Sequence, residues 1–205
     1  MAMPLSVDYA NVSRKARVLF DVDGVIADYV QMHVLAVIVS GVRSIPEHWR
    51  PTGWDIDEEL KLDPKEKAKV LNLTCAPGVA QRLVPFVGAV EAVKRIAKIA
   101  DVYFVTAPLP ESPTWSYDRA QWLINHFGDD LGKRVVHTHH KHLIPAHHLV
   151  DDKIDHCRKW EASNPGGIAL RYKAPEVDFA KDMVNVSGWD AVERFVQNTV
   201  RLLTA

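Results

Sequence analysis

The chain has 205 residues, 47% of them hydrophobic and 25% charged, so it is long enough for one ordinary domain with a substantial core. Its formal net charge of −1 gives no basis for bulk binding to a nucleic acid polymer or an acidic membrane, and no apolar run is long enough to cross a bilayer. With two cysteines far apart and no signal-peptide pattern, we expect a cytoplasmic protein without a disulfide framework.

The first predicted element is a short buried strand over residues 16–20, whose apolar run ends on Asp21 and Asp23. Gly24 then permits a turn, and a helix is predicted over residues 27–40. Two carboxylates spaced two residues apart point to the same side of an extended chain, where their like charges repel. The pattern therefore calls for a divalent cation, a shared proton, or both.

Two other interpretations fit part of this stretch. Aspartate and glycine are ordinary turn residues, so the same four letters also suit a surface turn. A calcium-binding EF-hand loop needs an oxygen ligand at its fifth position and a glutamate at its twelfth, where this chain has Val25 and Met32. The calcium interpretation is therefore excluded, and the surface turn stays an alternative to the metal site.

Residues 41–80 differ in character from the segments on either side. They contain tryptophans, prolines and a charged helical segment in which Asp63 is the N-cap and Pro64 the first helical residue. We interpret this region as a small helical cap. It is inserted into a core that comprises residues 16–40 and 81–205.

Strands and helices alternate along the remainder of the chain. Helices are predicted over residues 88–99, 117–127 and 187–203. Strands are predicted over residues 101–106, 134–138, 148–152 and 167–172. This alternation is typical of an α/β fold with a parallel sheet that is covered by helices on both faces.

Three of the predicted strands end on polar side chains, which are Asp21 with Asp23, Thr106, and Asp151 with Asp152. The carboxyl ends of parallel strands meet at one edge of a sheet, so these groups can share a site. Lys141 lies in a loop that can reach the same edge. Carboxylates, a hydroxyl, an ammonium group and a metal ion suit phosphoryl transfer, and a carboxylate can itself attack phosphorus.

Four segments carry a family resemblance: Asp21-Val-Asp-Gly-Val-Ile-Ala-Asp-Tyr29, Val105-Thr-Ala-Pro108, Trp122-Leu-Ile-Asn-His-Phe-Gly128 and Leu149-Val-Asp-Asp152. Together with Lys141, they make residues 16–155 similar to the haloacid dehalogenase-like (HAD) hydrolase superfamily, and within it to the 5'(3')-deoxyribonucleotidases. The resemblance implies a HAD-like Rossmannoid three-layer α/β/α core with a parallel sheet and a small helical cap after the first strand. It also implies a Mg²⁺-dependent phosphomonoesterase that hydrolyses 5'-(deoxy)ribonucleoside monophosphates through an aspartyl-phosphate.

The resemblance also implies residue roles. Asp21 is the expected nucleophile, and Asp23 the acid that protonates the leaving oxygen and then the base that activates water. Thr106 and Lys141 are expected to bind the phosphoryl group. The Asp21 carboxylate, the Asp23 backbone carbonyl and Asp152 are the expected Mg²⁺ ligands.

Further positions follow from the same resemblance. Asp151 is expected to support Asp152 rather than to bind the metal, and the backbone N–H of Ala107 to contact the phosphate. Tyr29 and Trp54 are the candidates for packing against the nucleoside base, with Trp54 equally suited to the core of the cap. The chain departs from the family pattern at residues 109–113, which lack the basic residue that often follows there.

Histidines are concentrated near the third and fourth predicted strands, at His137, His139, His140, His142, His147, His148 and His156. Surface or structural roles suit most of them, and His139 or His140 suits a position near phosphate or metal. Imidazoles at these spacings also suit zinc or nickel. A non-catalytic, His-rich metal-binding protein on the same fold is therefore one alternative function.

A HAD phosphatase that acts on another small phosphate ester is the second alternative. In either enzymatic interpretation, the partner is a small-molecule phosphate ester, with a nucleoside monophosphate as the leading candidate. A homodimer is compatible with the sequence.

Overall fold

In the computed structural model, residues 15–46, 49–52, 55–173 and 181–204 are described. Within these ranges one parallel sheet has the strand order β3-β2-β1-β4-β5-β6. The strands are β1 (Arg17–Phe20), β2 (Asp101–Thr106), β3 (Val135–His137), β4 (His148–Asp151), β5 (Ile168–Tyr172) and β6 (Val184–Val186). The five predicted strands are confirmed. The sixth, β6, was not predicted, because three residues are too few to show an alternating pattern.

The central strand β1 lies between β2 and β4, so both of its edges are hydrogen-bonded. Leu19 is paired with Tyr103 on one side and with Leu149 on the other. Val18, Leu19 and Phe20 are all completely buried. This explains why the sequence shows a continuous apolar run here rather than an alternation, since a central parallel strand is covered on both faces.

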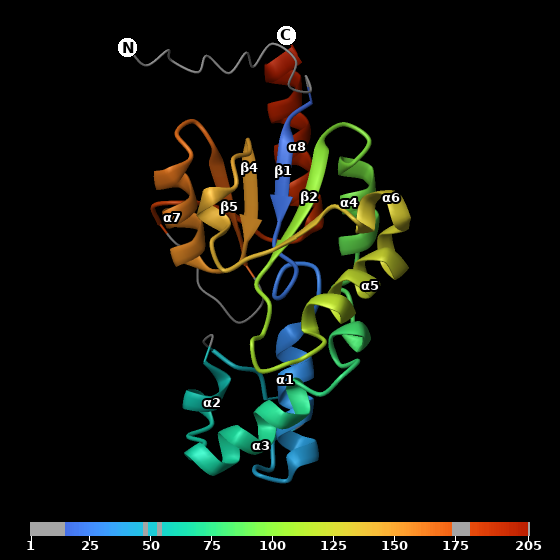
Figure 1. Ribbon diagram of the computed structural model, residues 1–205. Helices are drawn as coiled ribbons and strands as arrows, with labels where there is room; N and C mark the ends of the chain where they lie inside the picture. The colour runs from blue at the N-terminus through green and yellow to red at the C-terminus, as the bar shows by residue number, and fades with distance from the viewer. Residues whose placement is uncertain (1–14, 47–48, 53–54, 174–180, 205) are drawn as a thin grey trace, which may run out of the picture.

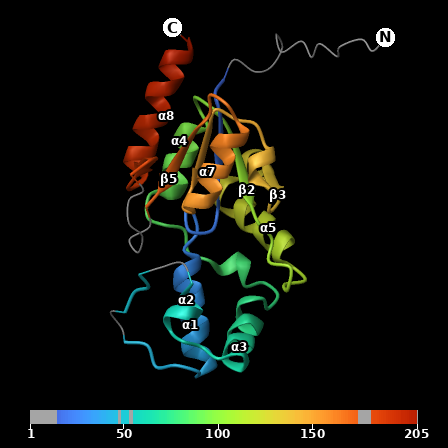
Figure 2. The same ribbon diagram turned by 90° about the vertical axis from the view of Figure 1, so that its left-hand side faces the viewer.

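Helices cover both faces of the sheet, as the alternating pattern predicted. The helices of the sheet-containing part are α4 (Ala89–Ile96), α5 (Trp115–Phe127), α6 (Asp129–Gly132), α7 (Ile154–Ser163) and α8 (Trp189–Thr204). Figure 2 shows α4 and α8 together on one side of the sheet and α7 on the other. The helices α6 and α7 were not predicted: α6 is a single turn, and α7 is rich in charged residues.

Two hydrophobic clusters fill the space between these layers. On one face, Phe20 and Phe104 of the sheet belong to the same buried cluster as Val93 of α4 and Val192 of α8. On the opposite face, Leu19 belongs to a smaller cluster that includes Trp160 of α7. Neighbouring residues of β1 thus point into different layers, as the period of a strand requires, and the three-layer arrangement follows.

The helical part of the chain lies beyond the carboxyl ends of the strands, toward which the arrowheads in Figure 1 point. It contains α1 (Tyr29–Ser40), α2 (Ile56–Glu59) and α3 (Pro64–Thr74). The predicted start of α3 is confirmed, since Asp63 and Glu66 form a reciprocal capping box. Among the described residues, no helix has the length and apolarity needed to cross a membrane.

This helical part has a small hydrophobic cluster of its own, formed by Ala36, Val37, Leu62 and Val70. Two of these residues belong to α1, which the sequence division placed in the core. The packing therefore favours a cap that begins with α1 rather than at residue 41. We propose this boundary, with the cap held to the sheet-containing part through the segments that enter α1 and leave α3.

Candidate active site

The turn after β1 places Asp21 at the centre of the sheet's carboxyl edge. The backbone N–H of Asp21 donates to the Val150 carbonyl at 2.9 Å, so the residue continues the strand pairing with β4. Its carboxylate accepts a hydrogen bond from the Val22 N–H at 2.7 Å. Gly24 has a φ of 80°, a left-handed conformation that favours glycine and turns the chain away from the sheet.

Lys141 lies between two carboxylates from different strands. Its Nζ is 2.6 Å from Oδ2 of Asp21 and 2.6 Å from Oδ2 of Asp151. All three side chains are buried, so the charges are shielded little by solvent. The predicted approach of Lys141 to the carboxylates is therefore present in the structure.

The adjacent residues Asp151 and Asp152 have opposite surroundings. Asp151 accepts from Lys141, from the Lys153 N–H at 2.9 Å, and lies 3.2 Å from Nδ1 of His156. Both carboxylate oxygens of Asp152 are buried and have no hydrogen-bond partner in the described part of the chain. A buried carboxylate without a donor is costly, so Asp152 needs either a proton or a cation.

The pKa values follow these surroundings. Burial raises the pKa of Asp21 to about 6, with Lys141 opposing the shift. Burial and the neighbouring Asp151 and Asp21 raise the pKa of Asp152 well above its usual value. For Asp151, burial also acts upward, but Lys141 and His156 outweigh it and hold its pKa below the usual range.

Asp23 is bound through both carboxylate oxygens. Oδ2 accepts a hydrogen bond from the Thr106 hydroxyl at 3.3 Å, and Oδ1 forms a short ion pair with Nη2 of Arg119. Thr106 is completely buried at the end of β2, where the sequence predicted it. The structure thus brings the predicted groups of β1 and β2 into direct contact.

Two places at the sheet edge are candidates for a metal site. One is the set of Asp21, Asp151 and His156, whose ligand atoms lie within 4.8 Å of one another. Lys141 makes this set unsuitable, because its ammonium group is already 2.6 Å from both of the carboxylates. The unpartnered carboxylate of Asp152 fits a hard divalent cation better, since such ions prefer oxygen ligands.

A cavity of about 550 Å³ lies above these groups, between the sheet edge and the helical part. The predicted residues that line it are Asp21, Asp23, Tyr29, Ala107, Lys141 and Asp152. Asp151 and Thr106 lie behind this surface, where they contact Lys141 and Asp23. Trp54, the other predicted base-stacking residue, falls outside the described residues.

The cap supplies the outer wall of the cavity. His33 of α1 bonds to Asp57 of α2 at 2.8 Å, and both side chains line the cavity. The ring of Tyr29 meets that of Trp115 edge to face, with centroids 6.2 Å apart. Trp115 was not predicted as a site residue. These aromatic and polar side chains leave room for a group larger than a phosphate.

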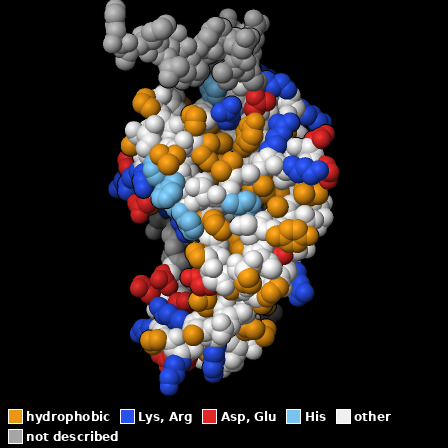
Figure 3. All heavy atoms as spheres, in the orientation of Figure 1, with side chains coloured by type: hydrophobic (Ala, Val, Ile, Leu, Met, Phe, Trp, Pro, Cys, Tyr) orange, Lys and Arg blue, Asp and Glu red, His pale blue; other side chains and the backbone are white. Residues whose placement is uncertain are grey.

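The histidine-rich segment does not assemble a metal centre within the described residues, because no three of its imidazoles belong to a common ligand group. His139 and His156 line the cavity, whereas His147 accepts from the Arg17 N–H at 2.9 Å. Figure 3 shows histidine side chains along the middle of this face, between the sheet-containing part and the cap. The His-rich alternative function gains no support.

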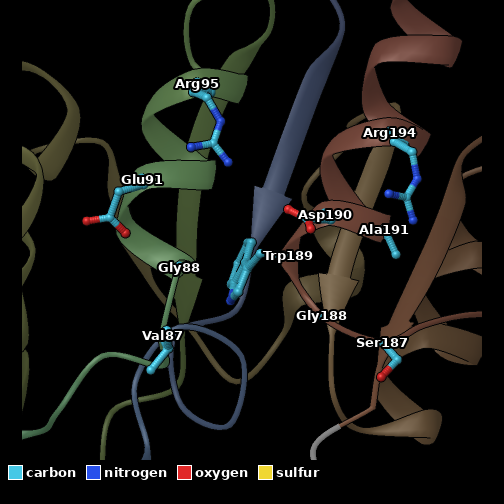
Figure 4. A pocket seen from close by; sticks show the side chains of 10 residues that line it. All are labelled: Val87, Gly88, Glu91, Arg95, Ser187, Gly188, Trp189, Asp190, Ala191 and Arg194. Carbon is cyan, nitrogen blue, oxygen red and sulfur yellow. The ribbon is translucent and has the colours of Figure 1, made fainter.

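A second cavity of about 590 Å³ lies between the first turns of α4 and α8 (Figure 4). Its charged lining residues are of both signs, with Arg95 and Arg194 beside Glu91 and Asp190. None of the predicted site residues lines it. The chemistry suggested by the sequence therefore belongs to the cavity at the sheet edge.

The sequence interpretation did not assign two residues that contact the predicted carboxylates. Arg119 contacts Asp23, and His156 contacts Asp151. Arg119 had a detectable signal: it is four residues after Trp115 and three before Trp122, which places an arginine on the apolar face of a helix. His156 was included among the clustered histidines, but its contact with Asp151 was not predicted, because α7 was not recognised.

Comparison with known proteins identifies relatives of the chain. Residues 14–202 match the family described as "5' nucleotidase, deoxy (Pyrimidine), cytosolic type C protein". The mitochondrial 5'(3')-deoxyribonucleotidase of Mus musculus is 30% identical over 157 residues, which cover 74% of this chain and 71% of that protein. The cytosolic-type 5'(3')-deoxyribonucleotidase of Homo sapiens is 28% identical over 151 residues, 69% of this chain and 73% of that protein.

Solved structures share the fold. A haloacid dehalogenase-like family hydrolase from Streptococcus pneumoniae has a TM-score of 0.59 at 11% identity and covers 89% of this chain and 98% of that chain. A structure described as a HAD-hydrolase from Bacillus subtilis, bound to magnesium, has a TM-score of 0.54 at 14% identity. The match covers 90% of this chain and 99% of that chain. The predicted HAD-like fold class is confirmed.

Proposed function

The chain belongs to the deoxy (pyrimidine), cytosolic type C family of 5'-nucleotidases, and we propose that it hydrolyses 5'-(deoxy)ribonucleoside monophosphates with Asp21 as the nucleophile. The observation that carries the proposal is the contact of Asp21 with Lys141 at 2.6 Å, in the lining of a cavity of about 550 Å³. Ammonium and carboxylate in this geometry supply a charge-neutralised nucleophile.

The first step is attack on phosphorus. A carboxylate oxygen of Asp21 forms a bond to phosphorus while the ester bond to the nucleoside oxygen breaks. The leaving oxygen takes a proton from Asp23. Lys141 and the backbone N–H of Ala107 neutralise the charge on the phosphoryl oxygens, and the Thr106 hydroxyl donates to one of them. The product is an aspartyl-phosphate and a free nucleoside.

The second step releases phosphate. A water molecule attacks phosphorus and transfers a proton to Asp23, which the first step left ionised. The bond between phosphorus and Asp21 then breaks, and inorganic phosphate leaves. Asp23 is protonated again, so atoms and charges balance over one turnover.

The donor set also supports a magnesium ion. The Asp21 carboxylate, the Asp23 backbone carbonyl and Asp152 would hold it, and Asp152 has no partner among the described residues without one. When bound, Mg²⁺ supplies positive charge to the phosphoryl group and the attacking carboxylate. Asp151 supports this arrangement indirectly, because it shares Lys141 with Asp21.

A substrate panel tests the proposal. Purified protein is assayed for phosphate release from deoxyribonucleotides, ribonucleotides and sugar phosphates, with Mg²⁺ present. Nucleoside 5'-monophosphates are expected to give the highest kcat/KM, since a bare sugar phosphate leaves the aromatic wall of the cavity without a partner. Equal or better hydrolysis of sugar phosphates would instead identify a phosphatase for another small ester.

Replacing the nucleophile tests the mechanism. Asp21→Asn replaces the nucleophilic carboxylate with a neutral amide and is expected to lower kcat by at least roughly 10³-fold. Asp182→Asn makes the same chemical change in an exposed carboxylate paired with Arg158, and it is expected to keep wild-type activity. Substantial turnover by folded Asp21→Asn protein would refute the assigned nucleophile.

Location and assembly remain predictions. The curated relatives are named as mitochondrial in one case and as cytosolic in another. A cytoplasmic protein agrees with the free thiols of Cys75 and Cys157. Size-exclusion chromatography with light scattering tests the homodimer.

A further inference from the structure

Arg119 is a buried charge that the two-step reaction leaves without a role. Its side chain is completely inaccessible to solvent, and its Nη2 contacts Oδ1 of Asp23. Within the described residues, its Nε and Nη1 atoms have no hydrogen-bond partner. Burying a guanidinium with two donor atoms unpaired is unfavourable, so its position calls for an explanation beyond packing.

Two tryptophan rings contact the guanidinium. The Arg119 Cζ atom lies 5.1 Å from the ring centroid of Trp115 and 5.5 Å from that of Trp122. Trp122 is in turn held by its Nε1–H, which donates to the Leu83 carbonyl at 2.8 Å. Stacking on indole faces partly replaces the missing hydrogen bonds. The guanidinium is therefore held rigidly, with one donor directed at Asp23.

The two carboxylate oxygens of Asp23 accept hydrogen bonds from two donors, and only one of these donors changes its partner in the proposed reaction. Thr106 donates to Oδ2 at 3.3 Å, and in the proposed reaction this hydroxyl turns to a phosphoryl oxygen. Arg119 donates to Oδ1 and comes from the buried face of α5, where it has no access to solvent. In that proposed reaction, substrate binding releases Oδ2 while Oδ1 stays bound.

We propose that Arg119 is the positioning residue of the acid–base group: it holds Oδ1 of Asp23 and so makes Oδ2 the oxygen that exchanges the proton. The inference rests on the proposed nucleotidase reaction. Rotation of the Asp23 carboxyl group about its Cβ–Cγ bond would exchange the two oxygens, and the ion pair with Arg119 opposes this rotation. A carboxylic acid protonated at Oδ2 still accepts at Oδ1, so the contact persists through both steps.

Arginine suits this position better than lysine. The guanidinium contacts both indole faces and is planar, so its Nη2–H has a defined direction toward Asp23, whereas an ammonium group is a mobile point charge. Arg119→Lys therefore keeps the positive charge and loses the orientation. Arg119→Met removes the charge while keeping most of the side-chain length.

The test uses leaving groups that depend differently on the acid. A nucleoside 5'-oxygen needs a proton to leave, whereas the phenolate of p-nitrophenyl phosphate leaves readily without one. We expect Arg119→Met to lower kcat/KM for a nucleoside monophosphate by about 100-fold and that for p-nitrophenyl phosphate by less than about 10-fold. Arg119→Lys is expected to lie between wild type and Arg119→Met with the nucleotide.

The same substitutions are then made in an Asp23→Asn background. There the acid is absent, so Arg119→Met is expected to change kcat/KM by less than about 3-fold further. Arg95→Met serves as the matched control, since Arg95 of α4 forms its ion pair with Glu193 of α8, and neither residue lines the cavity at the sheet edge. It is expected to leave both substrates unaffected. Thermal unfolding of every variant establishes that it is folded.

Four results would overturn the proposal. These are an equal loss with both substrates, an undiminished loss in the Asp23→Asn background, full activity of Arg119→Met, or failure of both Arg119 variants to fold, which would make the residue structural. Failure of the nucleotidase assignment looks different, because wild-type protein would then show no preference for nucleotides. The two outcomes are therefore distinguishable.

Discussion

Two pairs of aspartates at the ends of neighbouring strands have the same chemistry and different surroundings. After β1, Asp21 and Asp23 are separated by one residue, and each contacts a cation: Asp21 contacts Lys141, which it shares with Asp151, and Asp23 contacts Arg119. At the end of β4, Asp151 and Asp152 are adjacent, and the donors are divided unequally between them. Asp151 takes Lys141, a backbone N–H and His156, whereas Asp152 takes none among the described residues.

This difference shows how partners rather than residue type set the role of a carboxylate. Asp151 is stabilised as an anion and holds Lys141 in place. Asp152 is destabilised as an anion unless a cation joins it. The comparison therefore predicts opposite responses when each residue of the β4 pair is replaced by asparagine, which is nearly identical in shape.

Of the two substitutions at the end of β4, Asp152→Asn is expected to have the larger effect on magnesium-dependent catalysis. Removing the ligand charge should lower kcat at fixed Mg²⁺ by at least roughly 10²-fold, since metal charge stabilisation contributes several kcal/mol. In EDTA the same variant should unfold at a higher temperature than wild type, because an unpaired buried carboxylate is gone. Differential scanning calorimetry and phosphate-release assays measure both. A lower Tm in EDTA would contradict the assignment.

Asp151→Asn is expected to act in the opposite direction on stability. It removes one anion from the buried contact with Lys141 and leaves Asp21 as that cation's remaining carboxylate. Its Tm in EDTA should be lower than that of wild type, with kcat reduced by about 10- to 100-fold. The Mg²⁺ concentration at half-maximal activity should change far less than in Asp152→Asn. If this Mg²⁺ concentration changed more in Asp151→Asn than in Asp152→Asn, Asp151 rather than Asp152 would be the metal ligand.

The smallest expected effect is on the pH dependence of stability. The pKa of Asp21 is raised by burial from 3.8 to about 6, and that of Asp152 is raised as well, so the folded protein binds protons more tightly than the unfolded chain. Without metal, the Asp21 contribution to stability is present at low pH and is lost as pH rises through about 4 to 6, and the Asp152 contribution is lost in the same direction as pH rises. Mg²⁺ competes with the same protons.

We therefore expect Mg²⁺ to raise Tm by several degrees at about pH 7.5 and by much less at about pH 5. Asp151 has the opposite pKa shift, but its contribution changes only at lower pH, as that carboxylate becomes protonated. Calorimetry at both pH values measures the rise in Tm on adding Mg²⁺, and the same measurement on Asp152→Asn serves as the reference. A Mg²⁺-induced gain that is equal at both pH values would contradict it.

Much of the fold could be predicted because its signals are local. The apolar run of β1, its abrupt end on Asp21 and the glycine turn are adjacent in the chain, and the capping box of α3 spans four residues. The segments that were missed lack such signals. β6 has three residues, and α7 has only Cys157 and Trp160 as buried positions.

The site could be predicted as a set of residues but not as a set of contacts. Adjacent residues in an extended strand point to opposite sides, so only the register of β4 against β1, with Phe20 paired to Val150, decides which aspartate meets Lys141. Arg119 was missed for a related reason. Its pattern marks the apolar face of a helix, while its partner Asp23 is distant in the chain.

The sequence by itself determined the parallel α/β architecture and the acidic strand ends, because these depend on short-range periodicity and on residue type. Only the tertiary structure decided that Asp23 is bound at both oxygens and that Asp152 has no partner in the described chain. The physical reason is that charge pairing and desolvation depend on distances in space, which a one-dimensional pattern does not contain.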